Sequence, residues 1–194
     1  MGKLVIIEFL TVDGVMQGLG SPQEDTEGGF THGGWGAPYA ESIHQVTTSS
    51  GLKNTSSYLF GRKTYEKMAS YWPYQPADNL MASHLNATPK YVASRTLTDA
   101  AWAGTQILSS GVAAEVRNLK TTGDGDIAVL GSGVLCRELL AEHLVDEIRL
   151  FIHPLLLGAG KRLFGELPVP RHLALTSVGQ TDLGTVALVY SVQS

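Results

Sequence analysis

The feature that most constrains the fold is a recurring unit, in which a short run of β-branched and aromatic residues leads through a glycine into a helical pattern. The unit occurs at residues 57–60 before Gly61, at 105–108 before Gly111 and at 126–130 before Gly131. Strands that alternate with helices pair mostly in parallel, because each helix carries the chain back over the sheet. The pattern therefore predicts an α/β protein with helices on both faces of a largely parallel sheet.

Further strand-like and helical segments complete this arrangement. Strands are expected over residues 4–10, 57–60, 90–94, 105–108, 126–130, 145–153, 171–179 and 184–192, and helices over 38–51, from 61 to about 70, 112–120 and 134–142. Gly184 marks a tight turn between the last two strands, which predicts an antiparallel C-terminal hairpin. Residues 17–36 form an expected surface loop of a length that is usually functional. Without a repeat or a linker, a single domain over residues 1–194 is expected.

Composition excludes several classes of function. The net charge is −4 and no basic run occurs, which argues against a nucleic-acid partner. The six histidines have no metal-ligand spacing, so no metal is expected. The single cysteine, Cys136, excludes a disulfide framework and lies on an apolar helix face, where a core position is favoured over a nucleophile. The apolar run over residues 4–10 is interrupted by Glu8 and is too short for a membrane span, so a cytoplasmic protein is expected.

Two glycine-rich loops are candidate anion sites. In the first, a strand runs into Gly131-Ser132-Gly133 and a helix begins before Val134. Glycines allow close approach of a ligand, and the free N–H groups of a helix start favour phosphate. The third glycine of the dinucleotide fingerprint is absent, so a turn that serves only packing is an equal alternative.

The second loop adds positive charge to the same arrangement. Gly61 is followed by Arg62, Lys63 and Thr64, which place a guanidinium, an ammonium and a hydroxyl group in the first turn of a helix. Cations at a helix N-terminus oppose the helix dipole, and a bound anion would reverse that penalty. The alternative is a solvated helix start with two exposed basic residues.

A third strand ends in Ser94 and Arg95, a hydroxyl and a guanidinium suited to a phosphate monoester. Three strand ends suited to binding an anion in one domain favour a phosphorylated dinucleotide. Because the 2′-phosphate of NADPH needs its own cation, this residue pair predicts NADPH rather than NADH.

The order of these motifs resembles that of a known superfamily. The motifs are TVDG at 11–14, LFGRKTYE at 59–66, YWP at 71–73, VASRTL at 92–97, VLGSGVL at 129–135, LVDEIRL at 144–150 and PLLLGAGKRLF at 154–164. Together they resemble the dihydrofolate-reductase-like superfamily, and more narrowly the reductase domain of the bifunctional riboflavin-biosynthesis deaminase–reductase. The deaminase signature, His-x-Glu followed by Pro-Cys-x-x-Cys, is absent from this sequence.

The resemblance implies a three-layer α/β/α fold around a central sheet of about eight or nine strands. It implies that Gly61, Arg62 and Thr64 hold cofactor phosphates, that Ser94 and Arg95 take the 2′-phosphate, and that Gly131, Ser132 and Gly133 line the pyrophosphate and nicotinamide side. Gly158 and Gly160 match the riboflavin-type branch, whose members are often homodimers, although these glycines could equally form only a turn.

Two carboxylates are candidates for the catalytic group. Asp13 matches the Asp-Gly pair that follows the first strand in the riboflavin branch, and its alternative role is that of a turn former. Glu41 follows Trp35 and Pro38 at a spacing similar to that of some folate enzymes, but the flanking residues differ, so an exposed helix carboxylate is slightly favoured.

The sequence therefore predicts a reductase that transfers hydride from NADPH to a pyrimidine, pteridine or related heterocycle. The resemblance points to 5-amino-6-(5-phosphoribosylamino)uracil reduction, in which Lys161 and Arg162 could bind the substrate phosphate. Reduction of dihydrofolate is an alternative and would require Glu41 to face the pocket. A nucleotide-binding module without catalysis is a third possibility.

Overall fold

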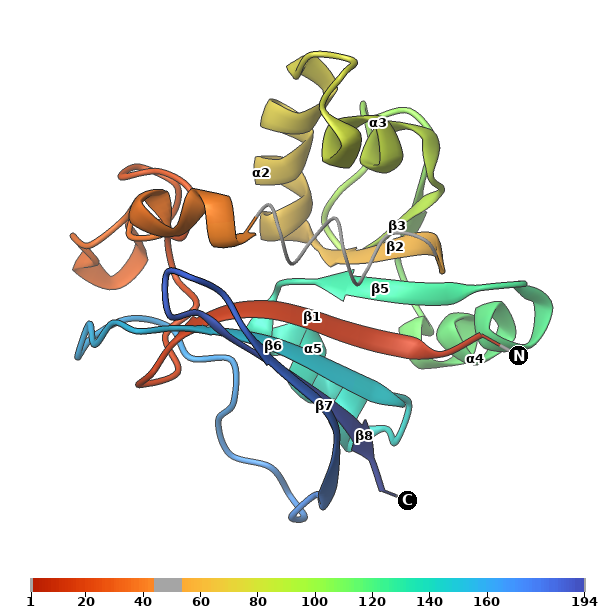
Figure 1. The fold of residues 1–194 in the computed structure, drawn as a ribbon. Coiled ribbons are helices and arrows are strands. Elements are labelled where there is room, and N and C mark those ends of the chain that lie inside the picture. Colours follow the sequence, from red (N-terminus) through yellow and green to blue (C-terminus); the bar gives the residue numbers. More distant parts are fainter. Residues whose placement is uncertain (1, 44–53, 194) are drawn as a thin grey trace.

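In a computed structural model of the chain, residues 2–43 and 54–193 are described, and their strands form one eight-stranded sheet. The strands are β1 (Leu4–Thr11), β2 (Thr55–Gly61), β3 (Lys90–Ala93), β4 (Thr105–Leu108), β5 (Asp126–Leu130), β6 (Glu147–His153), β7 (Leu173–Gln180) and β8 (Val186–Val192). Their order across the sheet is β4-β3-β2-β5-β1-β6-β8-β7 (Figure 1). Every pair from β4 to β6 is parallel, whereas β6–β8 and β8–β7 are antiparallel. The predicted mostly parallel sheet with an antiparallel C-terminal hairpin is confirmed.

The helices follow the strands as the sequence pattern predicts, with one addition. They are α2 (Arg62–Tyr71), α3 (Leu80–Ala87), α4 (Val112–Thr122) and α5 (Gly133–Ala141). Helix α3 was not among the predicted helices, although it has a recognisable start: the Asn79 side chain accepts a hydrogen bond from the Ala82 amide at 3.0 Å. The helix expected over 38–51 is helical at residues 40–43, after a 3₁₀ turn at Ala37–Tyr39, and its remaining residues lie outside the described part.

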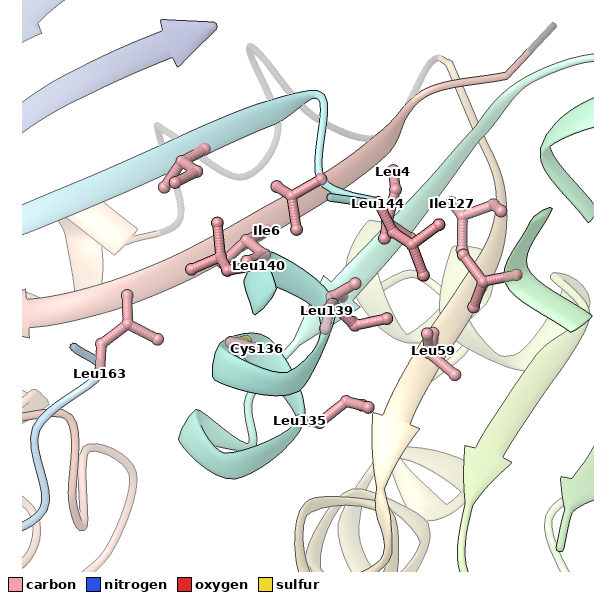
Figure 2. Packing of buried hydrophobic residues seen from close by; sticks show 14 of the residues in the cluster. Leu4, Ile6, Leu59, Ile127, Leu135, Cys136, Leu139, Leu140, Leu144 and Leu163 are labelled. Atoms are coloured by element: carbon pink, nitrogen blue, oxygen red, sulfur yellow. The ribbon is translucent and has the colours of Figure 1, made fainter. Parts of the chain in front are cut away.

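Two hydrophobic clusters lie on opposite faces of the sheet, because successive strand residues point to alternate sides. On one face, Leu59 and Val129 pack with residues of α4 and α5. On the other, Phe60 and Ala128 pack with residues of α2 and α3. Figure 2 shows α5 directing Leu135, Leu139 and Leu140 toward the sheet, with Cys136 on the same helix. Cys136 is fully buried, so the predicted core position is confirmed.

The C-terminal strands leave one edge of this sheet open. Strand β7 is the last strand of the sheet and pairs only with β8. A bulge between Leu175 and Ser177 shifts the register, so that Leu173, Leu175 and Val178 pair with alternate residues of β8 and lie on one face. All three side chains are exposed.

Candidate nucleotide-binding site

A large cavity lies at the ends of two neighbouring strands, from which the chain continues on opposite faces of the sheet. Helix α2 follows β2 on one face of the sheet, and α5 follows the adjacent β5 on the other. A switch of this kind opens a crevice at the carboxyl ends of the strands, where open α/β sheets bind ligands. The cavity has a volume of about 1270 Å³, which exceeds the usual range for a single small ligand. It therefore offers room for a dinucleotide and a substrate together.

The two glycine-rich loops meet at this crevice. A Cβ atom on Gly61 would stand 2.6 Å from the Cβ and 2.8 Å from the Oγ of Ser132. A Cβ on Gly131 would stand 3.0 Å from the Oγ1 of Thr64. The loops are thus in contact at distances that only glycine permits, and their sequence motifs form one wall.

Both loops present uncapped helix starts to this wall. Gly61 is the N-cap of α2 and Ser132 is the N-cap of α5, and neither provides a side-chain capping hydrogen bond. The first turn of α2 contains no acidic residue but carries Lys63 and Thr64. Uncapped amide groups at a helix start carry partial positive charge, so two converging starts favour an anionic ligand.

The structure brings six of the predicted cofactor residues to the cavity. Lys63, Thr64, Gly131, Ser132, Gly133 and Val134 line it. Gly61 lies behind the wall, against Ser132. The Arg62 guanidinium pairs with Glu66 at 2.8 Å on the exposed side of α2 and is not among the lining residues.

Ser94 and Arg95 lie beyond the end of β3, outside the cavity lining. Ser94 is buried, and its hydroxyl oxygen accepts hydrogen bonds from the amides of Thr96 and Leu97 at 3.2 and 2.9 Å. Arg95 is exposed. Because Gly61 and Ala93 are in register on neighbouring strands, the pair lies one strand away from the start of α2.

The Asp13 carboxylate connects the turn after β1 to the segment before Gly160. It accepts hydrogen bonds from the Thr11 hydroxyl at 2.6 Å and from the amides of Leu157 and Gly158 at 3.3 and 2.8 Å. The bond from Thr11 is the main reason that the pKa of Asp13 falls to about 2. Asp13 does not line the cavity, but its carbonyl oxygen accepts a hydrogen bond from Arg162, which does. These contacts favour a positioning role.

The other predicted carboxylate, Glu41, is exposed on the helix that begins at residue 40 and is not among the cavity-lining residues. The slightly favoured interpretation, an exposed helix carboxylate, agrees with this position.

A network of ion pairs closes one rim of the cavity. Lys161 contacts Asp25 at 2.7 Å and Glu27 at 2.6 Å, while Lys67 and Lys63 contact the same two carboxylates at 3.2 and 2.7 Å. Burial of Asp25 opposes its ionisation, but hydrogen bonds from Lys161, the Glu27 amide and Lys67 hold its pKa at about 2. The loop over residues 17–36 is thereby joined to α2 and to the segment around Lys161.

One buried group at the cavity lay outside the predicted site. Glu8 lines the cavity floor from the middle of β1, is only 6% exposed, and has a carboxylate oxygen, Oε1, without a hydrogen-bond partner among the described residues. Burial raises the pKa of Glu8 to about 8, although backbone hydrogen bonds from Gly131 and Phe9 act in the opposite direction. The sequence signal for this residue was the interruption of an apolar strand by a single carboxylate.

No helix within residues 2–43 and 54–193 has the length and apolar character needed to cross a membrane, and no group of three or more His, Cys, Asp or Glu residues there could hold a metal ion.

The chain is similar to known proteins in sequence and in structure. YyaP, an uncharacterized protein of Bacillus subtilis strain 168, is 26% identical over 195 residues, which cover 97% of this chain and 94% of YyaP. A solved structure from Shewanella sp. PV-4, whose name places it in riboflavin biosynthesis, matches with a TM-score of 0.70 at 19% identity over the whole of both chains. A pyrimidine reductase-like protein from Corynebacterium diphtheriae matches with a TM-score of 0.61 at 14% identity, over all of this chain and 92% of that one.

The two structural matches support the fold alone, which is the expected α/β arrangement around a mostly parallel sheet. The decisive match is to the family model of the RibD C-terminal domain, which covers residues 3–187. The chain belongs to the RibD C-terminal domain family.

Proposed function

We propose that the protein is an NADPH-dependent reductase of the riboflavin-biosynthesis type. Family membership supports a riboflavin-type reductase in general. The observation that carries the cofactor assignment is the contact between two uncapped, glycine-led helix starts, with a Cβ on Gly61 only 2.6 Å from Ser132. Such a wall accommodates a diphosphate, which needs close backbone approach and amide donors.

The residues present fit a dinucleotide. Lys63 and Thr64 and the segment from Gly131 to Val134 would hold the diphosphate and the nicotinamide side, with Gly61 allowing the two loops to meet. Ser94 and Arg95 would take the 2′-phosphate, and Arg62 would contribute positive charge at the α2 start. A bound reduced nicotinamide supplies a hydride to the substrate. The remaining space beside Glu8 and Phe9 would receive the acceptor.

The proposed substrate is a phosphoribosylamino-pyrimidine, reduced at the sugar carbon to a ribitylamino product. Lys161 and Arg162 line the cavity and are candidates for its phosphate. Lys161 already contacts Asp25 and Glu27, so phosphate binding there would exchange one anion for another. Asp13 would act on the substrate side through Arg162, whose Nε donates to the Asp13 carbonyl at 2.8 Å.

The cofactor assignment is tested by equilibrium titration of the protein with NADPH and NADH. We expect tighter binding of NADPH, and we expect Arg95→Ala to weaken NADPH by about tenfold while leaving NADH unchanged, because one charge-assisted contact is lost. Arg117→Ala, which removes an exposed arginine from α4, is the matched control. Equal affinity for the two cofactors would contradict the preference, and absence of both would contradict the nucleotide site.

Turnover is tested by following NADPH absorbance with two acceptors. Oxidation with the phosphoribosylamino-pyrimidine and not with dihydrofolate is the expected result. Oxidation with dihydrofolate would identify the folate activity, and Glu41→Gln would then test its carboxylate. NADPH binding without oxidation by either acceptor would support a nucleotide-binding module, or a different heterocyclic substrate.

The protein is further proposed to form a homodimer, as the resemblance to the riboflavin-type branch implies. The exposed side chains of Leu173, Leu175 and Val178 on the open edge of the sheet support this assignment, since exposed apolar patches mark interaction surfaces. Sedimentation analysis of the wild-type protein and of Val178→Lys would test it. A monomeric wild-type protein would contradict the proposal.

A further inference from the structure

Glu8 has an unusual environment for a carboxyl group. No cation among residues 2–43 and 54–193 forms a salt bridge with it. Glu147, a second buried carboxyl group, shows the contrast, because Lys3 and Arg149 contact it at 2.9 and 2.7 Å. A buried charge is stable only when it is paired, so Glu8 is a group that the fold keeps neutral.

The carboxyl group of Glu8 lies beside the glycine wall. The Gly131 backbone is one of two groups that partly offset the effect of burial on its pKa. Its Oε1 is 3.6 Å from the position that a Cβ on Gly131 would occupy, and the Thr64 Oγ1 is 3.0 Å from the same point. Glu8 therefore lies beside the Gly131 turn that precedes the α5 amides, and it also lines the cavity.

We propose that Glu8 is a positioning residue of the nucleotide site, whose buried carboxyl group supports the Gly131 turn and keeps negative charge away from the bound phosphates. The inference rests on the proposed nucleotide binding. A neutral carboxyl can hold the loop without repelling an anion, whereas a carboxylate at the same position would oppose every phosphate on the wall. Weak solvation of this buried position leaves such a repulsion poorly screened.

Other ionisable groups near Glu8 are uncharged, paired or directed elsewhere. On α5, burial and the proximity of Glu8 raise the pKa of the Cys136 thiol well above its ordinary value, so this group adds no charge. The Arg137 guanidinium of the same helix donates to the carbonyl oxygens of Arg162 and Leu163.

The neighbouring strands and α2 contribute no free charge to this position. On β6, Arg149 is in register with Ile7, so it projects from the face opposite to Glu8. On α2, the Lys63 and Lys67 ammonium groups contact Glu27 and Asp25. Strand β5 ends beside Glu8 at Leu130, and neither Leu130 nor the following Gly131 carries a charge.

The affinity for a bound anion must then depend on whether the Glu8 carboxyl group is protonated. Burial raises the pKa of Glu8 to about 8, so the carboxyl is neutral at pH 7 and ionises above pH 8. A bound phosphate stabilises the neutral form and raises this pKa further. By linkage, affinity for the nucleotide is constant below pH 8 and falls above it, and binding near pH 8.5 takes up a proton.

The test is NADPH affinity between pH 7.5 and 9.5 for the wild-type protein, Glu8→Gln and Glu138→Gln. The 2′-phosphate is fully ionised throughout this range, because its second pKa is about 6. Glu138 is exposed on α5 and provides the same chemical change away from the wall. We expect wild-type and E138Q affinities to fall by up to about tenfold per pH unit above the pKa, as loss of one required proton dictates. The E8Q affinity should stay constant within about twofold, since a neutral amide cannot ionise.

Proton uptake is a second readout, independent of any variant. Calorimetric titrations of wild-type protein with NADPH in buffers of different ionisation enthalpy at pH 8.5 should show uptake of a fraction of a proton, and none at pH 7. Circular dichroism at each pH checks that every protein remains folded. A pH-independent wild-type affinity, absence of proton uptake or an unchanged slope in folded E8Q would overturn the inference while leaving the proposed function intact. Failure to bind NADPH at every pH would overturn the proposed function and, with it, this role of Glu8.

Discussion

Replacement of Gly61 by alanine tests whether the two glycine loops form one wall. The backbone at Gly61 has φ −76° and ψ 157°, which any residue can adopt, so the added methyl group introduces no backbone strain. It would, however, stand 2.6 Å from the Cβ and 2.8 Å from the Oγ of Ser132. Carbon atoms pack at about 3.5–4.0 Å, so the loops must separate by about 1 Å.

Two opposing effects determine the size of the change. Overpacking of this kind costs about 1–3 kcal/mol. A Gly→Ala change at an ordinary backbone conformation stabilises the fold by about 0.4–1 kcal/mol, because it reduces the conformational entropy of the unfolded chain. The free energy of unfolding of Gly61→Ala should therefore fall by about 1–2 kcal/mol, and NADPH affinity should fall by at least about tenfold because the Ser132 backbone moves with the loop.

Urea denaturation and NADPH titration of four proteins measure this contact. They are the wild type, Gly61→Ala, Ser132→Gly and the double variant, in which removal of the Ser132 side chain restores the space for the methyl group. The double-mutant cycle should give a favourable coupling of about 1 kcal/mol or more. Gly179→Ala is the control, because a Cβ there meets nothing within 4 Å. A Gly61→Ala protein with wild-type stability and affinity, or one that Ser132→Gly does not rescue, would refute the contact.

Three further predictions concern groups away from the wall. Burial lowers the pKa of His153 to about 4. Because this histidine binds a proton below about pH 6.5 in the unfolded chain, about 3 kcal/mol of the free energy of unfolding should be lost as the pH falls from 6.5 to 4. Acid denaturation of His153→Gln should lack this loss. Lys90 donates hydrogen bonds to three carbonyl oxygens at the end of α3, so Lys90→Met should lower the free energy of unfolding in urea by about 2–4 kcal/mol, and an unchanged value would contradict this capping role. Lys161→Met should lower the free energy of unfolding by less than about 1 kcal/mol, because the ion pairs with Asp25 and Glu27 are partly exposed. Limited proteolysis should nevertheless cleave the loop over residues 17–36 faster in this variant. Unaltered cleavage would show that the ion pairs do not hold the loop.

The sheet was predictable because its signals are local. The parallel strands β2, β4 and β5 are short runs that lead through a glycine into a helix, and Gly184 has the positive φ of 77° that a tight turn between β7 and β8 requires. Helix α3 escaped prediction because only eight residues carry its pattern, and the Asn79 cap is the main remaining signal. The spatial order of the strands depends on which side each helix crosses, and that information is spread over the whole chain.

The meeting of the two glycine-rich loops at one cavity was predictable for a related reason. Lys63, Thr64 and the Gly131–Val134 segment follow strands directly, so parallel pairing of β2 with β5 brings them to the same edge. Long-range partners were not predictable from the pattern. The pairing of Lys161 with Asp25 and Glu27 joins residues more than 130 positions apart, and it involves the loop whose course no local rule specifies.

The position of Glu8 in an apolar strand was visible in the sequence, but its role could not be inferred from neighbouring residues. A carboxylate in an apolar strand violates the rule that a buried position takes an apolar residue, and the violation was visible in the sequence as an interruption. Its meaning depends on the register of β1 with β5, which places Ile7 beside Leu130 and so brings Glu8 to the level of Gly131. A leucine at this position would bury more apolar surface and leave no unpaired oxygen. A costly buried carboxyl group beside the Gly131 turn is therefore better explained by the proposed ligand binding than by stability, since local rules are broken where function requires it.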